Sequence, residues 1–352
     1  MSRLKTAPWR SRSRRGGSAD PAPLQERIAQ LEAEARRLRA IAAGDDPEPG
    51  LAGPIFVGGT GRSGASIVGH MIGRHPDIVA LPSGLRFHTA GGGFRRVVSG
   101  RETPAQFTTD VAETEYSLTG AAGRATALAR LATKTQLQHA TQRLEELADH
   151  DVAAALRVFM HTLVDPFALG HGGRTWVDTT PQNIAAADGL LDVFPTAKMI
   201  HTVRDGRDVA ASMVTMAWAP DAFDDALDLW ATRLRAAHHG SRAADPDRLL
   251  VVRLEELIHL ERDREFDRIV ALLGIHDHEP LRRYFDTTMD SRRGHVGRWR
   301  TEVDASQTTT IDTRYRKLYD ELASEGLQCL PADPDAVDKI HRDRTPADRR
   351  NA

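Results

Sequence analysis

A short apolar run that leads directly into a glycine-rich turn constrains the fold of this chain more than any other feature. Pro54–Val57 is typical of a buried strand, and the turn Gly58–Ser66 follows it at once. Glycines let a backbone approach an anion closely, and the unpaired N–H groups at the start of a helix point toward that anion. The segment therefore predicts a strand, a phosphate-binding loop and a helix, whose apolar positions are Ile67, Val68, Met71 and Ile72.

The loop has the glycine spacing of a P-loop but not its lysine. Gly59 and Gly64 are correctly spaced, Ala65 stands where the lysine is expected, and Ser66 keeps the hydroxyl. The cation lies inside the loop as Arg62, which can grip a phosphate with two parallel hydrogen bonds. The missing lysine argues against hydrolysis of ATP or GTP. The predicted phosphate ligands are Gly59, Thr60, Gly61, Arg62, Ser63, Gly64, Ala65 and Ser66.

Two further segments turn this loop into a family resemblance. Met199–Val203 is a predicted strand that leads into the helical segment Arg204–Met213, and a third match is Arg292–Trp299. Together with the loop, these segments resemble sulfotransferases that use 3′-phosphoadenosine-5′-phosphosulfate (PAPS), over roughly residues 53–300. The resemblance implies that the first loop holds the 5′-phosphosulfate. It also implies that the 3′-phosphate is held by Arg204, Ser212, Arg293 and Gly294.

The same resemblance implies transfer of a sulfuryl group to an acceptor hydroxyl, on a carbohydrate, a peptide tyrosine or a small natural product. Arg62 and the loop amides fit the stabilisation of the leaving charge. The general base is less obvious. Similar bacterial enzymes have a glutamate just before an Arg-Phe-His sequence, where this chain has Gly84, and many have a lysine where this chain has Thr179.

Three explanations of the missing glutamate stay open. His88, whose ordinary pKa lies near neutrality, is one candidate base, and Asp178 at the mouth of the same sheet is another. Alternatively, the chain binds PAPS and catalyses poorly. A structural histidine and a carboxylate that pins a loop are the competing interpretations of His88 and Asp178.

Composition narrows the possible partners and the cellular compartment of the protein. The formal net charge of −2 over 352 residues gives no general attraction to nucleic acid, and the single cysteine, Cys329, suits a reducing compartment. No uninterrupted apolar stretch is long enough to span a bilayer, and no apolar segment follows the basic N-terminus as in a secretory signal. We therefore expect a cytoplasmic enzyme, without a metal, because sulfuryl transfer needs none.

The chain divides into one large domain with extensions at both ends. Leu24, Ile28 and Leu31 begin a stripe at helical spacing over residues 24–42, which suits either a short coiled coil that forms a homodimer or a helix that packs on its own domain. The predicted parts are a disordered basic tail (1–22), a helical extension (23–43), a linker (44–52), the sulfotransferase domain (53–330) and a charged tail that frays (331–352).

The predicted fold class is α/β, with a parallel sheet flanked by helices as in the P-loop sulfotransferases. Strands alternate with helices along the chain, and phosphates should bind at the carboxyl ends of the strands. Residues 104–170 predict several helices that cover the acceptor site. The further predicted strands are 78–81, 175–178, 197–203 and 249–252. The two rival functions are a P-loop kinase-like phosphotransferase and a non-catalytic nucleotide-binding scaffold.

Overall fold

A computed structural model describes residue 51 and residues 53–114, 127–242, 244–276, 278–289 and 295–343. The predicted basic tail, the helical extension and most of the linker lie outside these residues. So do Arg293 and Gly294, two of the predicted 3′-phosphate ligands.

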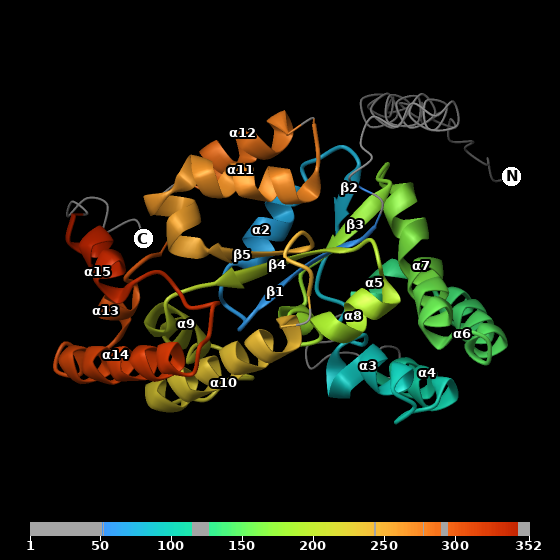
Figure 1. Cartoon of the computed structure of the whole chain (residues 1–352), viewed down its shortest axis with the longest axis horizontal. Helices are drawn as coiled ribbons and strands as arrows, with labels where there is room; N and C mark the ends of the chain where they lie inside the picture. Colours follow the sequence, from blue (N-terminus) through green and yellow to red (C-terminus); the bar gives the residue numbers. More distant parts are fainter. Residues whose placement is uncertain are drawn as a thin grey trace, which may run out of the picture. The chain divides into compact units, whose positions relative to one another are not determined.

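Five parallel strands form the centre of the described domain, in the order β2-β3-β1-β4-β5 (Figure 1). The central strand β1 pairs with β4 so that Phe56 lies beside Met199 and Gly59 beside Thr202. This arrangement confirms the predicted parallel α/β fold. The strands are β1 (Ile55–Gly59), β2 (Ile78–Ala80), β3 (Thr175–Asp178), β4 (Lys198–Val203) and β5 (Leu249–Arg253).

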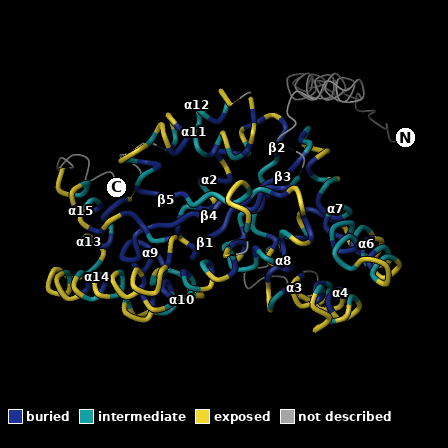
Figure 2. Tube along the Cα trace, in the orientation of Figure 1, coloured by how far each residue is buried: buried dark blue, intermediate teal, exposed yellow. Residues whose placement is uncertain are grey.

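Alternating side chains of the strands build a core on each face of the sheet. Ile55 and Val57 of β1 pack with α2 (Ala65–Ile72), α11 (Arg262–Leu273) and α12 (Glu279–Thr288). Phe56 points to the opposite face, where it packs with the helices between β2 and β4. Figure 2 shows that β1, β3 and most of β4 are buried between these layers, whereas β5 is largely of intermediate burial. A continuous apolar strand with helices on both faces explains why the run before the glycine loop carries no polar residue.

The helices between β2 and β4 form most of the second layer. A 3₁₀ turn at Ala90–Gly92 precedes the first of them, and Pro181–Asn183 forms another 3₁₀ turn directly after β3. The helices are α3 (Gly93–Val98), α4 (Pro104–Ala112), α5 (Ala127–Leu131), α6 (Lys134–Ala148), α7 (Val152–Gly170) and α8 (Ala187–Val193). They confirm the helical character predicted for residues 104–170, over the part of that segment that the structure describes.

Helix α7 is long and largely apolar, although Arg157, His161 and Asp165 interrupt its apolar sequence. Over the described residues, α7 alone has the length and hydropathy of a membrane span. Its buried face, which includes Leu156, Phe159 and Leu163, packs into the core of the domain. The opposite face carries an ion pair between His161 and Asp165. The apolar character of α7 therefore follows from its place in the core.

The C-terminal half completes the domain. The π-helical turn Glu256–Leu260 follows β5, and Gly274 ends α11 in the left-handed conformation. The remaining helices are α9 (Gly206–Met213), α10 (Phe223–Ser241), α13 (Trp299–Glu302), α14 (Thr308–Ser324) and α15 (Pro334–Asp343). Within the predicted tail, residues 334–343 form α15 rather than fraying, because this helix buries Val337 and Asp338.

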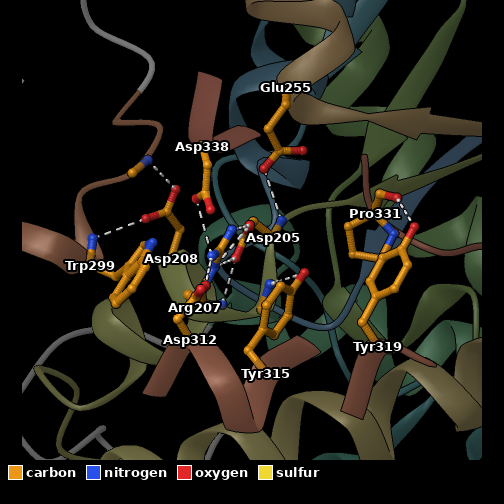
Figure 3. A network of polar contacts seen from close by, with 12 residues as sticks. Asp205, Arg207, Asp208, Glu255, Trp299, Asp312, Tyr315, Tyr319, Pro331 and Asp338 are labelled. Atoms are coloured by element: carbon orange, nitrogen blue, oxygen red, sulfur yellow. Dashed lines mark hydrogen bonds and ion pairs between the residues drawn. The ribbon is translucent and has the colours of Figure 1, made fainter. Parts of the chain in front are cut away.

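A buried arginine ties these last helices to the sheet. The side chain of Arg207, in α9, has no exposed surface and lies between the rings of Trp299 and Tyr315. Three carboxylates surround its guanidinium (Figure 3), namely those of Asp205, Asp312 and Asp338. A buried charge is tolerated only when it is paired, so α14 and α15 are integral to the domain.

Candidate active site

The loop after β1 has the backbone geometry of an anion-binding concavity. Gly61, Arg62 and Gly64 have φ angles of 81°, 59° and 97°, which lie in the left-handed region. Helix α2 begins directly afterwards at Ala65. Successive backbone N–H groups in such a turn point to one side, where a helix start adds its dipole. The predicted strand, loop and helix are therefore present in the predicted order.

Close packing explains two of the loop glycines. A Cβ atom on Gly59 would lie 2.3 Å from the carbonyl oxygen of Thr202, and one on Gly64 would lie 2.8 Å from Leu254 Cδ1. The hydroxyl of Thr202 donates to the carbonyl oxygen of Gly58, at 3.0 Å. Neighbouring strands thus fix the loop before any ligand is bound.

The hydroxyls predicted as phosphate ligands fall into two groups. Ser63 is buried, and its hydroxyl lies 3.1 Å from that of Thr202. Thr60 is also buried, and its hydroxyl donates to the carbonyl oxygen of Gly61. Ser66 is exposed and lines the cavity beside the loop. Ser63 and Thr60 therefore hold the loop through their side chains, which leaves Ser66 as the hydroxyl placed to reach an anion.

Three predicted ligands from distant parts of the sequence meet at this loop. The Nε atom of Arg62 donates to the hydroxyl of Ser212 at 2.8 Å, and Arg204 Nη1 donates to the carbonyl oxygen of Arg62 at 3.2 Å. Arg204 follows β4, and Ser212 lies in α9. The Nε atom of Arg204 is buried without a hydrogen-bond partner among the described residues. An orphaned buried donor of a cation is a site where an anion fits.

The described part of the third segment lies against the second. Arg204 Nη2 donates to the carbonyl oxygen of His295 at 2.9 Å. The carboxylate of Asp208, in α9, accepts from the backbone N–H groups of Gly297 and Trp299. The two segments that resemble the 3′-phosphate elements are therefore adjacent, although they lie about ninety residues apart.

A cavity of about 380 Å³ opens beside these groups. Its polar wall includes Arg62, Ser66 and Arg204. The apolar wall consists of Ile67, Leu254, Ile258 and Met289. A lining that combines cations with apolar side chains suits an anion attached to a flat apolar group. Over the residues that the structure describes, no three His, Cys, Asp or Glu side chains come together as a metal site.

The comparison with protein families decides the affiliation. The sequence model of the sulfotransferase family matches residues 54–280, which is more than half of the chain. The chain belongs to the sulfotransferase family. It is thus a sulfotransferase-family enzyme, as the three segments predicted.

Solved structures of sulfotransferases are similar to this one at low sequence identity. The sulfotransferase domain from the Synechococcus PCC 7002 olefin synthase is 20% identical, with 85% of this chain and 92% of that chain covered and a TM-score of 0.42. For the sulfotransferase domain from the curacin biosynthetic pathway, the identity is 16%, the coverage 68% and 80%, and the TM-score 0.40. A sulfotransferase from Mycobacterium tuberculosis H37Rv is 17% identical, with coverage of 72% and 75% and a TM-score of 0.40.

Both candidate bases of this sulfotransferase are buried in a polar network. The carboxylate of Asp178 accepts from the backbone N–H groups of Leu85 and Thr180 and from Asn183 Nδ2, at 2.8–3.0 Å. His88 Nε2 lies 2.8 Å from Asn183 Oδ1. His88 is 1% exposed, Asp178 is not exposed, and neither lines a described cavity. Both side chains are therefore engaged in hydrogen bonds within the domain, as a structural histidine and a loop-pinning carboxylate would be.

The position of the missing glutamate lies on a second cavity, of about 630 Å³. A Cβ atom on Gly84 would lie 2.7 Å from Thr180 Oγ1 and 2.9 Å from Thr180 Cα. Any side chain there would have to displace the segment after β3, so this chain accommodates only glycine at that position. Two carboxylates, Glu102 and Asp110, do lie on the wall of the second cavity. Thr179 and Pro181, the neighbours of Thr180, line the first cavity, so one short segment separates the two.

Sequence reasoning missed Arg233 of α10, whose side chain holds the glycine loop by a hydrogen bond to its backbone. Its Nη1 atom donates to the carbonyl oxygen of Thr60 at 3.0 Å, and its guanidinium lies 5.1 Å from the ring centre of Trp218. Burial lowers the pKa of Arg233. The available signal was a cation between the apolar residues Trp230 and Leu234 of α10, a position where a charge needs a partner.

Proposed function

We propose that this protein transfers a sulfuryl group from PAPS to an acceptor hydroxyl. The observation that carries the proposal is the meeting of Arg62, Ser212 and Arg204 at a glycine loop, beside a cavity with an orphaned arginine donor. When bound, PAPS supplies the sulfuryl group and leaves as 3′,5′-bisphosphoadenosine.

Each residue of the cavity has a role that follows from its contacts. Ser212 engages Nε of Arg62, which leaves the two terminal nitrogens to face an anion at the loop. They would stabilise negative charge on the 5′ side, together with the loop amides and Ser66. Arg204 Nε would bind the 3′-phosphate, and Leu254 and Met289 would contact the adenine.

The second cavity is the proposed site of the acceptor. Gly84 on its wall packs against Thr180, whose neighbours Thr179 and Pro181 line the first cavity, and its apolar lining includes Leu85, Phe87 and Phe107. Glu102 and Asp110 are the carboxylates on its wall that could accept the proton of the hydroxyl. The proposed acceptors are those that the family resemblance implies, namely a carbohydrate, a peptide tyrosine or a small natural product.

Calorimetric titration with 3′,5′-bisphosphoadenosine, ATP and adenosine 5′-monophosphate tests the cofactor. We expect the bisphosphate to bind much more tightly than the other two. The Arg204→Ala variant should lose most of this preference and keep its affinity for the monophosphate. A preference for ATP would favour the kinase-like rival, and equal losses for both adenosine nucleotides would place the 3′-phosphate elsewhere.

Transfer from PAPS to a panel of hydroxyl acceptors tests the reaction itself. Glu102→Gln and Asp110→Asn should differ in turnover if one of them accepts the proton, because only that variant loses the base. Tight binding of the bisphosphate without transfer to any acceptor would favour the scaffold rival.

A further inference from the structure

Asp208 holds together two segments of the candidate cofactor site. Its side chain is fully buried in α9 (Figure 3). One carboxylate oxygen accepts from the backbone N–H of Gly297 at 2.9 Å, and the other accepts from that of Trp299 at 3.0 Å. Hydrogen bonds from amides to a buried carboxylate are charge-assisted and therefore strong. Asp208 thus fixes the start of the C-terminal segment on α9.

The same carboxylate faces Arg204. The closest approach is 3.6 Å, between Asp208 Oδ2 and Arg204 Nη2. That nitrogen also donates to the carbonyl oxygen of His295, and Nη1 donates to that of Arg62. The contacts on both terminal nitrogens therefore hold the guanidinium in one orientation, with Nε as the donor left for a ligand.

We propose that Asp208 is a positioning residue for the 3′-phosphate of the nucleotide. It acts through two partners, since it orients Arg204 and anchors the C-terminal segment at Gly297 and Trp299. The inference rests on the proposed function, because it concerns how the same nucleotide is recognised. It assigns to Asp208 a part in selectivity for the 3′-phosphate, although this carboxylate touches no ligand itself.

Replacing Asp208 with asparagine removes both effects at once. The amide group can accept from one of the two backbone N–H groups but presents its own N–H groups to the other. It also removes the negative charge that faces Arg204. We expect Asp208→Asn to weaken binding of 3′,5′-bisphosphoadenosine by about tenfold or more, because removing one partner of a buried ion pair has an effect of at least that size. Binding of adenosine 5′-monophosphate should change less than about threefold, since that nucleotide does not use Arg204.

Asp338 provides a matched control. It is also a buried carboxylate of the polar network in Figure 3, and it pairs with Arg207, Arg300 and Arg316. Among the described residues, its ion pairs and hydrogen bonds are with these three arginines and not with Arg204 or the backbone of Gly297 and Trp299. Asp338→Asn should therefore lower the melting temperature and leave the ratio of the two dissociation constants as in the parent.

The test is calorimetry with both nucleotides on the full chain, for the parent, Asp208→Asn and Asp338→Asn. If the preference for the bisphosphate over the monophosphate falls in Asp208→Asn but not in Asp338→Asn, the positioning role is supported. An unchanged ratio in Asp208→Asn, with a parent that prefers the bisphosphate, overturns this inference and leaves the proposed function in place. A parent without that preference overturns both.

Hydrogen exchange on the unmodified chain covers the case in which Asp208→Asn does not fold. If Asp208 couples Arg204 to the backbone that it anchors, the bisphosphate should slow exchange at the amides of Gly297 and Trp299 more than the monophosphate does. Equal protection by the two nucleotides at these amides overturns the inference.

Discussion

Replacing Glu255 with glutamine should stabilise the protein above pH 7 and change its stability little near pH 5. Glu255 follows β5 and has no exposed surface. Its Oε1 atom accepts from the backbone N–H of Asp205, whereas Oε2 has no hydrogen-bond partner among the described residues. Burial, with the charge of Asp205 as a further cause, raises the pKa of Glu255 from 4.5 to about 7.

The sign of the pH dependence follows from the two pKa values. Between pH 4.5 and about 7, the folded protein keeps a proton on Glu255 that the unfolded chain has released. The free energy of unfolding therefore falls as the pH rises through this window. At about 1.4 kcal/mol for each pKa unit, the full loss is roughly 3 kcal/mol. Glutamine stays neutral at every pH and keeps an oxygen for the N–H of Asp205, so it avoids this loss.

Urea unfolding of the parent and Glu255→Gln, measured from pH 5 to pH 8.5, gives the assay. We expect the free energies of unfolding to be close at pH 5 and to differ by roughly 3 kcal/mol at pH 8 and above, in favour of the variant. Glu256→Gln is the control, because it removes a neighbouring carboxylate that is partly exposed and paired with Arg253. A difference between parent and Glu255→Gln that stays constant across the whole pH range would refute the argument.

Three further perturbations test other parts of the structure. Burial lowers the pKa of His201 to about 3, so protonation of this histidine in the unfolded chain destabilises the fold as the pH falls below 6.5. The His201→Leu variant should therefore unfold at a lower pH than the parent when acid unfolding is followed by circular dichroism. An unchanged midpoint pH would count against this. Gly59→Ala should lower the melting temperature and weaken bisphosphate binding, because its Cβ would meet Thr202, whereas Gly170→Ala, with open space around it, should do neither. Arg62→Ala should reduce turnover by about 100-fold or more, and parental turnover in that variant would contradict the site.

The sequence predicted the fold well because the decisive signals are local. An apolar strand such as Pro54–Val57 needs helices on both faces, and Ile55 and Phe56 do point to opposite cores. Gly274 is another local signal, since a glycine after an apolar helix favours the left-handed end found there. Segments judged by charge alone were harder to interpret. The charged residues of α15 predicted a frayed tail, although Asp338 pairs with Arg207 from a distant helix.

The site was only partly predictable, because hydroxyl and carboxyl groups serve either ligands or the fold. Arg62, Arg204 and Ser212 meet as the motif spacing indicated. Nothing local could show that Ser63 bonds with Thr202 or that Asp178 pins three neighbouring groups. Such contacts depend on which strands become neighbours, and they decide whether a polar side chain remains available.

The burial of Arg207 makes the order of synthesis relevant to the site. Asp312 lies 105 residues after Arg207, and Asp338 comes later still. In a nascent chain whose α14 and α15 have not yet left the ribosome, Asp205 is the one of these three carboxylates that can neutralise the guanidinium of Arg207. Arg207 lies three residues after Arg204, which faces the cavity. The sheet and its glycine loop can form earlier, but the half of the site around Arg204 should mature only when the last helices dock. The protein would then bind the nucleotide with full affinity only after α14 and α15 have folded onto the domain.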